Sequence, residues 1–231
     1  GSGAFLTKAL EVMNDKYKDF GNRGDQYTKS EILTSNIYGI DLDSQAVEIA
    51  KLNLLVEALD KKAKLPDLTN NIRVGNSLIS GSEEKLKKYF GPHWRDKKPF
   101  NWQEEFPFCH SRESGNPCFD IIIGNPPYVV LDFDIDELSL FKEKYKSSQG
   151  GKVNLYKLFI ERAISLLKEG GYLGFICPSN YISSADSYEL RKIILENTNI
   201  IEIIEYSEKE KVFANVTQSL TTIILKKDKN P

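Results

Sequence analysis

Apolar and polar positions in the first half of the chain follow two periods, one helical and one extended. Apolar residues at helical spacing predict a helix over 5–13 and a second helix over 46–58, with Asp43 as its N-cap. The polar, glycine-containing stretch 19–30 predicts a loop. Short apolar runs bounded by turn residues predict strands at 37–40, 71–75 and 119–123.

The second half of the chain continues the alternation. A helix is predicted from Asn154 to about Glu169, where Gly170 and Gly171 end it, and another over 187–196. Apolar and β-branched runs predict strands at 172–177, 200–205 and 217–225, the last two forming an antiparallel hairpin. The fold class is therefore α/β, a mostly parallel sheet with an antiparallel terminal hairpin.

Residues 79–118 interrupt this alternation. They hold a helix-like KLKKYF, a polar segment and the stretch CHSRESGNPC. A long connection inside a compact domain is usually functional or mobile. We therefore expect one catalytic domain over 1–231 with a surface insertion at about 79–118, whose tip, 110–117, is poorly ordered.

Composition and charge narrow the classes of function. The 231 residues carry 31 Lys and Arg against 33 Asp and Glu, a net charge of −2, so the chain lacks the basic excess of a dedicated nucleic-acid binder. The longest apolar run falls far short of a membrane span. Three sparse cysteines argue against a disulfide scaffold and favour a cytoplasmic protein. The spacing of Cys109, His110 and Cys118 with His93 fits no recurring zinc pattern, so we expect no metal.

The strongest candidate chemistry follows the strand at 119–123. Gly124 ends that strand, and Asn125, Pro126, Pro127 and Tyr128 come directly after it. In open α/β sheets, ligands bind beyond the carboxyl ends of strands. The prolines fix φ and remove two backbone donors, so the carbonyls and the Asn125 amide form a rigid array of acceptors beside an aromatic ring. Such an array suits a planar amino or amide nitrogen, although a proline-rich turn with a capping Asn is the plain alternative.

Two further features suggest a nucleoside-like ligand. The N-terminal GSGAFL is a glycine turn that opens a helix and lets backbone approach a ligand closely. Asp41 ends the strand predicted at 37–40, where acidic residues of Rossmann-like folds accept hydrogen bonds from ribose hydroxyls. Asp41 could instead cap the following helix, but Asp43 is better placed for that role.

The order of the motifs resembles a known family. The motifs are GSGAFL, YGIDLD, VGNSL, FDIIIGNPPYV, NLYKLFIERAISLLKEGGYLGFICPSNYI and VFANVTQSLTTIIL, and they cover nearly the whole chain. They resemble S-adenosylmethionine-dependent adenine-N6 DNA methyltransferases of the gamma arrangement. FNWQEEFP further resembles the type II restriction-modification branch, nuclease-fused or Eco57I-like. In that branch FNWQEEFP leads almost directly into the FD strand, so CHSRESGNPC looks like a peptide added to this chain.

The resemblance implies a Rossmann-like methyltransferase fold, a cofactor and a set of roles. Asn125, Pro126, Pro127 and Tyr128 would be catalytic, with Tyr128 and Phe213 stacking on the flipped adenine. Asn76 stands where the family usually has an Asp that contacts the cofactor adenine, and its oxygen can still accept that hydrogen bond. The implied S-adenosylmethionine site consists of Gly1, Gly3 and Phe5 at the methionine end, Asp41 at the ribose, and Leu42, Asn76 and Phe159 at the adenine.

The resemblance also implies parts outside the 231 residues. A first strand and a cofactor-binding segment would precede Gly1, a DNA-recognition domain would follow Pro231, and the parent protein could carry a nuclease. The partner would be double-stranded DNA. Two alternatives stay open: a methyltransferase of glutamine side chains in release factors, which also has an NPPY loop, and a non-catalytic cofactor-binding fragment.

Overall fold

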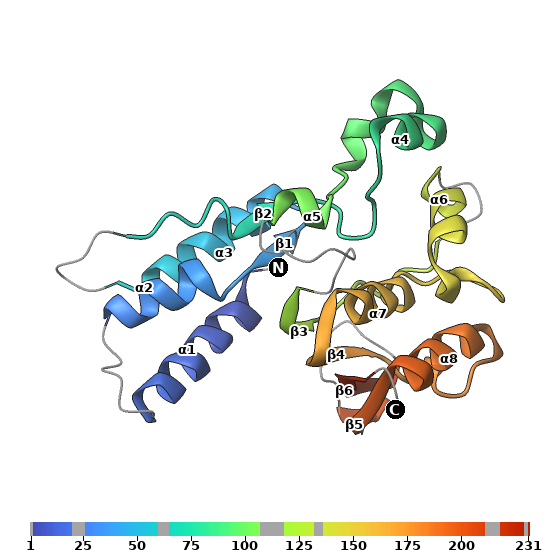
Figure 1. Ribbon diagram of the computed structural model, residues 1–231. Helices are drawn as coiled ribbons and strands as arrows, with labels where there is room; N and C mark the ends of the chain where they lie inside the picture. Colours follow the sequence, from blue (N-terminus) through green and yellow to red (C-terminus); the bar gives the residue numbers. More distant parts are fainter. Residues whose placement is uncertain are drawn as a thin grey trace. The chain divides into compact units, whose positions relative to one another are not determined.

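The computed structural model describes residues 2–19, 26–59, 65–106, 118–131, 136–210, 218–228 and 231. The chain divides into two compact units (Figure 1). The first consists of Gly1–Ser80 and Arg95–Phe100, and the second of Gly81–Trp94 and Asn101–Pro231. Gly91–Lys97 form a 3₁₀ helix at the boundary along the sequence. Each unit has a sheet of its own.

The first unit packs three helices beside a two-stranded parallel sheet (Figure 1). Strands β1 and β2 pair from Gly39 opposite Ile72 to Asp41 opposite Val74. The buried core includes Leu10, Ile32, Leu33, Val47, Leu54 and Ile72. In chain order the elements are α1 (Ala4–Asp19), α2 (Gln26–Ser35), β1 (Gly39–Asp41), α3 (Ser44–Glu57) and β2 (Ile72–Val74).

The second unit is built on a four-stranded sheet in the order β3-β4-β6-β5. Its helices are α4 (Glu83–Phe90), α5 (Trp102–Glu105), α6 (Asp136–Lys144), α7 (Leu155–Leu166) and α8 (Tyr188–Asn197). Its strands are β3 (Phe119–Gly124), β4 (Leu167–Pro178), β5 (Thr198–Tyr206) and β6 (Leu220–Lys227). Short 3₁₀ turns lie at Lys146–Ser148, Ser179–Tyr181, Ala185–Ser187 and Glu208–Glu210.

Helices α7 and α8 lie beside the sheet of this unit (Figure 1), and both contribute side chains to its core. Apolar side chains of both helices pack on the alternate residues of β4 and β6 that face them, as expected of a half-covered sheet. The buried residues are Tyr156, Ile160, Ile164, Leu173, Phe175, Cys177, Leu190, Ile194, Ile223 and Leu225.

The α/β class is confirmed, but the expectation of a mostly parallel sheet is wrong for the second unit. β3 and β4 are parallel, whereas β6 runs antiparallel to both β4 and β5. The predicted terminal hairpin is present. The last strand of the hairpin, β6, lies between β4 and β5 and runs opposite to both. This one strand therefore makes both antiparallel pairings of the sheet. The described strands form two sheets rather than one, and a missing first strand stays a prediction.

Two local predictions need correction. The stretch 19–30 is not wholly a loop, because α2 begins at Gln26. Helix α7 ends at Leu166 rather than near Glu169, since Leu167 already pairs with Phe119 of β3. The basic segment 142–152 is partly packed: Ser147 is buried and its N–H donates to the Glu161 carboxylate at 2.8 Å.

The predicted insertion holds ordered structure in its described part. KLKKYF lies in α4, as expected, and Asn101 precedes the short helix α5. Residues 95–100 belong to the first unit. The expected tip falls in 107–117, outside the described residues, so the insertion as a whole stays a prediction.

The described cysteines differ in state. Cys177 is buried and free, whereas Cys118 is disulfide-bonded. Within the described ranges, the structure contains no helix whose length and apolar content would suffice to cross a bilayer.

Candidate functional site

The Asn-Pro-Pro-Tyr loop begins where β3 ends, beside β4. Gly124 pairs with Phe175, and a Cβ on Gly124 would lie 3.3 Å from the Phe175 ring. Pro126 is buried, while Asn125 and Pro127 are exposed. Pro126 therefore packs into the second unit, while the Asn125 amide is accessible to a ligand.

Tyr128 anchors the loop to the sheet. Its hydroxyl donates to the Ile176 carbonyl at 3.2 Å, and its ring packs against the core under α7 and α8. Burial, with Cys177 nearby, raises the pKa of Tyr128 to about 12, so the phenol stays a hydrogen-bond donor at neutral pH. The Tyr128 ring, which is predicted to stack on a base, is thus held in place through its hydroxyl.

A short antiparallel contact fixes the far side of the loop. The Leu131 N–H donates to the Val153 carbonyl at 2.8 Å, and the Leu155 N–H donates to the Val129 carbonyl at 2.9 Å. Leu155 begins α7, so this contact ties the loop to the helix that carries Phe159. Phe159 is half-buried against the core, and its contact with cofactor stays a prediction.

In the first unit, the start of α1 is held close to α3. Gly3 has φ +78°, and a Cβ there would lie 2.8 Å from the Cβ of Ala50. The Asn53 amide donates to the Ser2 carbonyl at 2.9 Å. Phe5 is 46% exposed. Glycine at position 3 is therefore required by both backbone conformation and space, and an exposed aromatic ring stands beside it in the chain.

Asp41 ends β1 and organises the turn into α3. Its Oδ1 accepts from the Asp43 N–H at 2.9 Å, and Asp43 in turn accepts from the Gln45 N–H. Asp43 is the N-cap, as predicted, so Asp41 does not fill that role. Leu42, between them, is 51% exposed.

Asn76 follows β2 at the same edge of the sheet. The Gly75 N–H donates to the Asp41 carbonyl at 2.9 Å, which brings the two strand ends together. The Asn76 Oδ1 accepts from the Leu78 N–H at 3.1 Å and keeps a second lone pair for a ligand. The structure thus gathers Asp41, Leu42 and Asn76 at one edge of the two-stranded sheet, and their contact with a cofactor stays a prediction.

Sequence reasoning missed two residues of the first unit. The Lys98 ammonium donates to the Leu42 carbonyl at 3.1 Å. Phe100 is buried against Gly75, where a Cβ would lie 2.5 Å from its ring. Both belong to the stretch expected as an insertion, and no local pattern indicates that this stretch returns to the strand ends.

Some predicted site residues lie outside the described part of the chain. These are Gly1 and Phe213, together with Cys109 and His110 of the zinc alternative. Among the described residues, no group of three His, Cys, Asp or Glu side chains is arranged to hold a metal ion.

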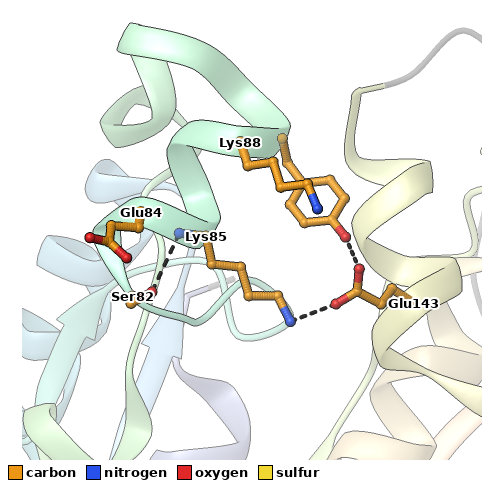
Figure 2. A pocket seen from close by; sticks show the side chains of 6 residues that line it. Ser82, Glu84, Lys85, Lys88 and Glu143 are labelled. Atoms are coloured by element: carbon orange, nitrogen blue, oxygen red, sulfur yellow. Dashed lines mark hydrogen bonds and ion pairs between the residues drawn. The ribbon is translucent and has the colours of Figure 1, made fainter.

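A hollow between α4 and α6 contains none of the predicted site residues (Figure 2). The Lys85 ammonium pairs with the Glu143 carboxylate at 2.8 Å, and the Tyr89 hydroxyl donates to the same carboxylate. The hydrogen bond and charge of Lys85, with a smaller contribution from the charge of Lys88, lower the pKa of Glu143. The hollow is lined by Ser82, Glu84, Lys85, Lys88, Tyr89 and Glu143.

The fold is similar to that of solved restriction-modification proteins. The M protein of the Type I restriction enzyme EcoKI aligns with a TM-score of 0.64 at 16% identity, over 98% of this chain and 38% of that one. A nuclease-deletion mutant of the Type ISP restriction-modification enzyme LlaGI, in complex with a DNA substrate mimic, aligns with a TM-score of 0.66 at 17% identity, over 99% and 20%.

The family follows from sequence. The family model of the Eco57I restriction-modification methylases matches residues 35–213, so the chain belongs to this family. The family that the motifs predicted is thereby confirmed.

Curated relatives are consistent with this assignment. The type II restriction enzyme and methyltransferase RM.Eco57I of Escherichia coli is 33% identical over 256 residues, 99% of this chain and 24% of that protein. The type II methyltransferase M.BstVI of Geobacillus stearothermophilus is 29% identical over 173 residues, 72% and 31%. The chain spans less than a third of the length of both relatives.

Proposed function

We propose that this protein transfers a methyl group from S-adenosylmethionine to the exocyclic N6 of adenine in double-stranded DNA, as the modification activity of a restriction-modification system. The observation that carries the proposal is the Asn125 amide, exposed at the carboxyl end of β3 on a loop anchored by Tyr128. Membership of a methylase family supports methyl transfer as the reaction.

The loop suits an amine that is a poor nucleophile. The lone pair of N6 is delocalised into the adenine ring. The Asn125 oxygen and a neighbouring carbonyl would accept the two N6 hydrogens, which favours tetrahedral geometry and localises the lone pair on nitrogen. Pro126 and Pro127 bring no N–H that would compete for these acceptors.

The first unit fits S-adenosylmethionine. The close approach of Gly3 to Ala50 leaves backbone rather than a side chain at the start of α1. Asp41 would accept hydrogen bonds from the ribose, Leu42 would pack on the adenine, and Asn76 would accept from its amino group. Gly1 and Phe5 would line the methionine end. When bound, the cofactor supplies an electrophilic methyl group.

The target adenine would have to leave the DNA stack. A paired, stacked amine is out of reach, and stacking on Tyr128 and Phe213 would offset the loss of pairing by about 1–3 kcal/mol.

The names of the relatives, restriction enzymes and methyltransferases, support DNA as the partner. DNA in the bacterial cytoplasm would be the substrate. Because the net charge is −2, we propose that most phosphate contacts are made outside these 231 residues, by a recognition domain and, where present, a nuclease domain.

Methyl transfer from labelled cofactor tests the proposal. The full-length gene product is incubated with bacterial DNA or with a release-factor protein, and the DNA is digested to nucleosides. We expect label in N6-methyl-2′-deoxyadenosine, and Asn125→Ala should reduce it by about 100–1,000-fold. Label in a cytosine nucleoside would overturn the choice of base, and label only in the release factor would favour the glutamine alternative.

A further inference from the structure

The turn after β4 leaves the sheet beside the catalytic loop. β3 and β4 are parallel neighbours, with Gly124 opposite Phe175, so Asn125–Tyr128 and Ser179–Tyr181 both follow carboxyl ends at one edge. The Tyr128 hydroxyl bonds to the Ile176 carbonyl, two residues before β4 ends at Pro178. A side chain exposed on the 179–181 turn is therefore placed near the proposed target base.

Asn180 is that side chain, and a buried phenol sets its orientation. The Tyr156 hydroxyl donates to the Asn180 Oδ1 at 2.6 Å. Tyr156 is fully buried, and burial, with Cys177 and Tyr181 beside it, raises its pKa, so the hydroxyl remains a donor. With Oδ1 occupied by this donor, the two N–H groups of Nδ2 point away from Tyr156. Asn180 itself is exposed, and within the described part of the chain Nδ2 has no hydrogen-bond partner.

The backbone around Asn180 is held by several hydrogen bonds. One Arg191 nitrogen donates to the Tyr181 carbonyl at 2.8 Å and to the Ser184 carbonyl at 2.6 Å. The Ser179 N–H donates to the Ser219 carbonyl at 3.0 Å, next to β6. The amide donor is therefore presented on a preorganised turn, the arrangement that binding sites require.

The chemistry of the proposed substrate supplies an acceptor for this donor. In adenine, the N6 amino group stands between two ring nitrogens, N1 and N7, and each carries a lone pair. A side-chain amide is the group that proteins use to match this donor and acceptor pair. Resting on the proposed function, we propose that the Asn180 Nδ2 donates a hydrogen bond to a ring nitrogen beside N6 of the flipped adenine, and that Tyr156 is a positioning residue that orients Asn180.

Replacing single atoms of the substrate tests this contact. The full-length gene product is given duplexes whose target adenine is intact, 1-deaza or 7-deaza, and kcat/KM is measured. For the unaltered enzyme, we expect one of the two analogues to lose about tenfold, the value of one hydrogen bond. Asn180→Ala should lose a similar factor on adenine and should no longer discriminate against that analogue.

Three variants separate the contact from a general disturbance. Asn180→Asp keeps the acceptor for Tyr156 but replaces the donor, so it should lose at least as much as Asn180→Ala. Tyr156→Phe should weaken the discrimination while leaving cofactor affinity unchanged. Asn197→Ala is the matched control: its amide donates to Ile193 at the opposite edge of the sheet, and it should retain the full rate and the full discrimination.

The possible results are distinct. Full analogue discrimination in Asn180→Ala, or an unchanged rate on adenine, would overturn the proposal and leave the proposed function intact. An unaltered enzyme that tolerates both analogues would also overturn it. An enzyme that methylates no DNA would overturn both proposals.

Discussion

The two units hold their candidate site residues by different means. In the first unit, β1 and β2 have three residues each, and the side chains of Asp41 and Asn76 make hydrogen bonds to their own turns. In the second unit, Tyr128 bonds to β4 and packs on a core that two helices bury. The first arrangement leaves both side chains half-buried at the strand ends, and the second holds the Asn125–Tyr128 loop on a buried core. We therefore expect substitutions of Asp41 and Asn76 to act on cofactor binding and those of the Asn125–Tyr128 loop to act on transfer.

The largest expected effect is that of Asn125→Ala. Removing the amide takes away an acceptor for the N6 hydrogens, and the loss of one polar group that stabilises a transition state costs about 100–1,000-fold in rate. Single-turnover methylation at saturating cofactor measures this. Cofactor affinity, measured by calorimetry, should not change. Asn199→Ala, whose amide pairs with Asp228 on the sheet, is the control and should keep its rate.

The corresponding change in the first unit is Asp41→Ala. Cofactor affinity should fall by about 1.5–3 kcal/mol, the range for hydrogen bonds to a charged group. Calorimetric titration with S-adenosylmethionine measures this. Asp43→Ala removes the N-cap of α3 and should lower stability by about 0.5–2 kcal/mol with little effect on affinity. Equal affinities for Asp41→Ala and the unaltered protein would contradict the ribose assignment.

Gly3→Ala tests the close approach of α1 to α3. The added Cβ would collide with Ala50 in a strained conformation, so we expect a loss of about 1–3 kcal/mol in stability. Gly170→Ala is matched, since Gly170 also has φ +78° but a Cβ there would meet no atom within 4 Å. Denaturant titration compares the two variants. If both lose the same stability, the contact with Ala50 has no energetic role.

Lys144 gives the second unit a distinctive pH dependence. Burial, together with the Arg162 charge, lowers the pKa of Lys144 from 10.5 to about 7. Below pH 7, Lys144 is charged in both the folded and the unfolded state, and the full cost of its buried charge lowers the free energy of unfolding. Between pH 7 and pH 10.5 the folded state has lost a proton that the unfolded state keeps, so the free energy of unfolding rises with pH. Lys144→Met should therefore be more stable than the unaltered protein at pH 6.5, and the difference in Tm should shrink by pH 10. A difference that stays constant with pH would contradict this.

Tyr128→Phe is expected to have the smallest effect. It removes one hydrogen bond to β4, which contributes about 0.5–1.5 kcal/mol to stability, but it keeps the ring. Thermal unfolding and the methylation rate should both change little. Tyr128→Ala removes the stacking surface as well, worth about 1–3 kcal/mol, and should lose clearly more activity. Similar activities for the two variants would mean that the ring does not stack on the base.

The sequence predicted the features that local patterns determine. The strand at 119–123, the Asp43 cap and the terminal hairpin follow from apolar periodicity and turn residues, and all three are present. The insertion of β6 between β4 and β5 depends on long-range pairing, which periodicity does not encode. The same reason explains why Lys98 and Phe100 were missed, because their partners lie about 25 to 56 residues earlier in the chain.

One experiment tests most directly whether the two units perform separate tasks. Asn125→Ala and Asp41→Ala are each assayed for cofactor affinity and for the single-turnover rate of adenine methylation at saturating cofactor. We predict opposite patterns: Asn125→Ala binds cofactor normally and transfers almost no methyl, whereas Asp41→Ala binds weakly and recovers its rate when cofactor saturates. If both variants lose affinity and rate together, the division between a binding unit and a transfer unit is wrong.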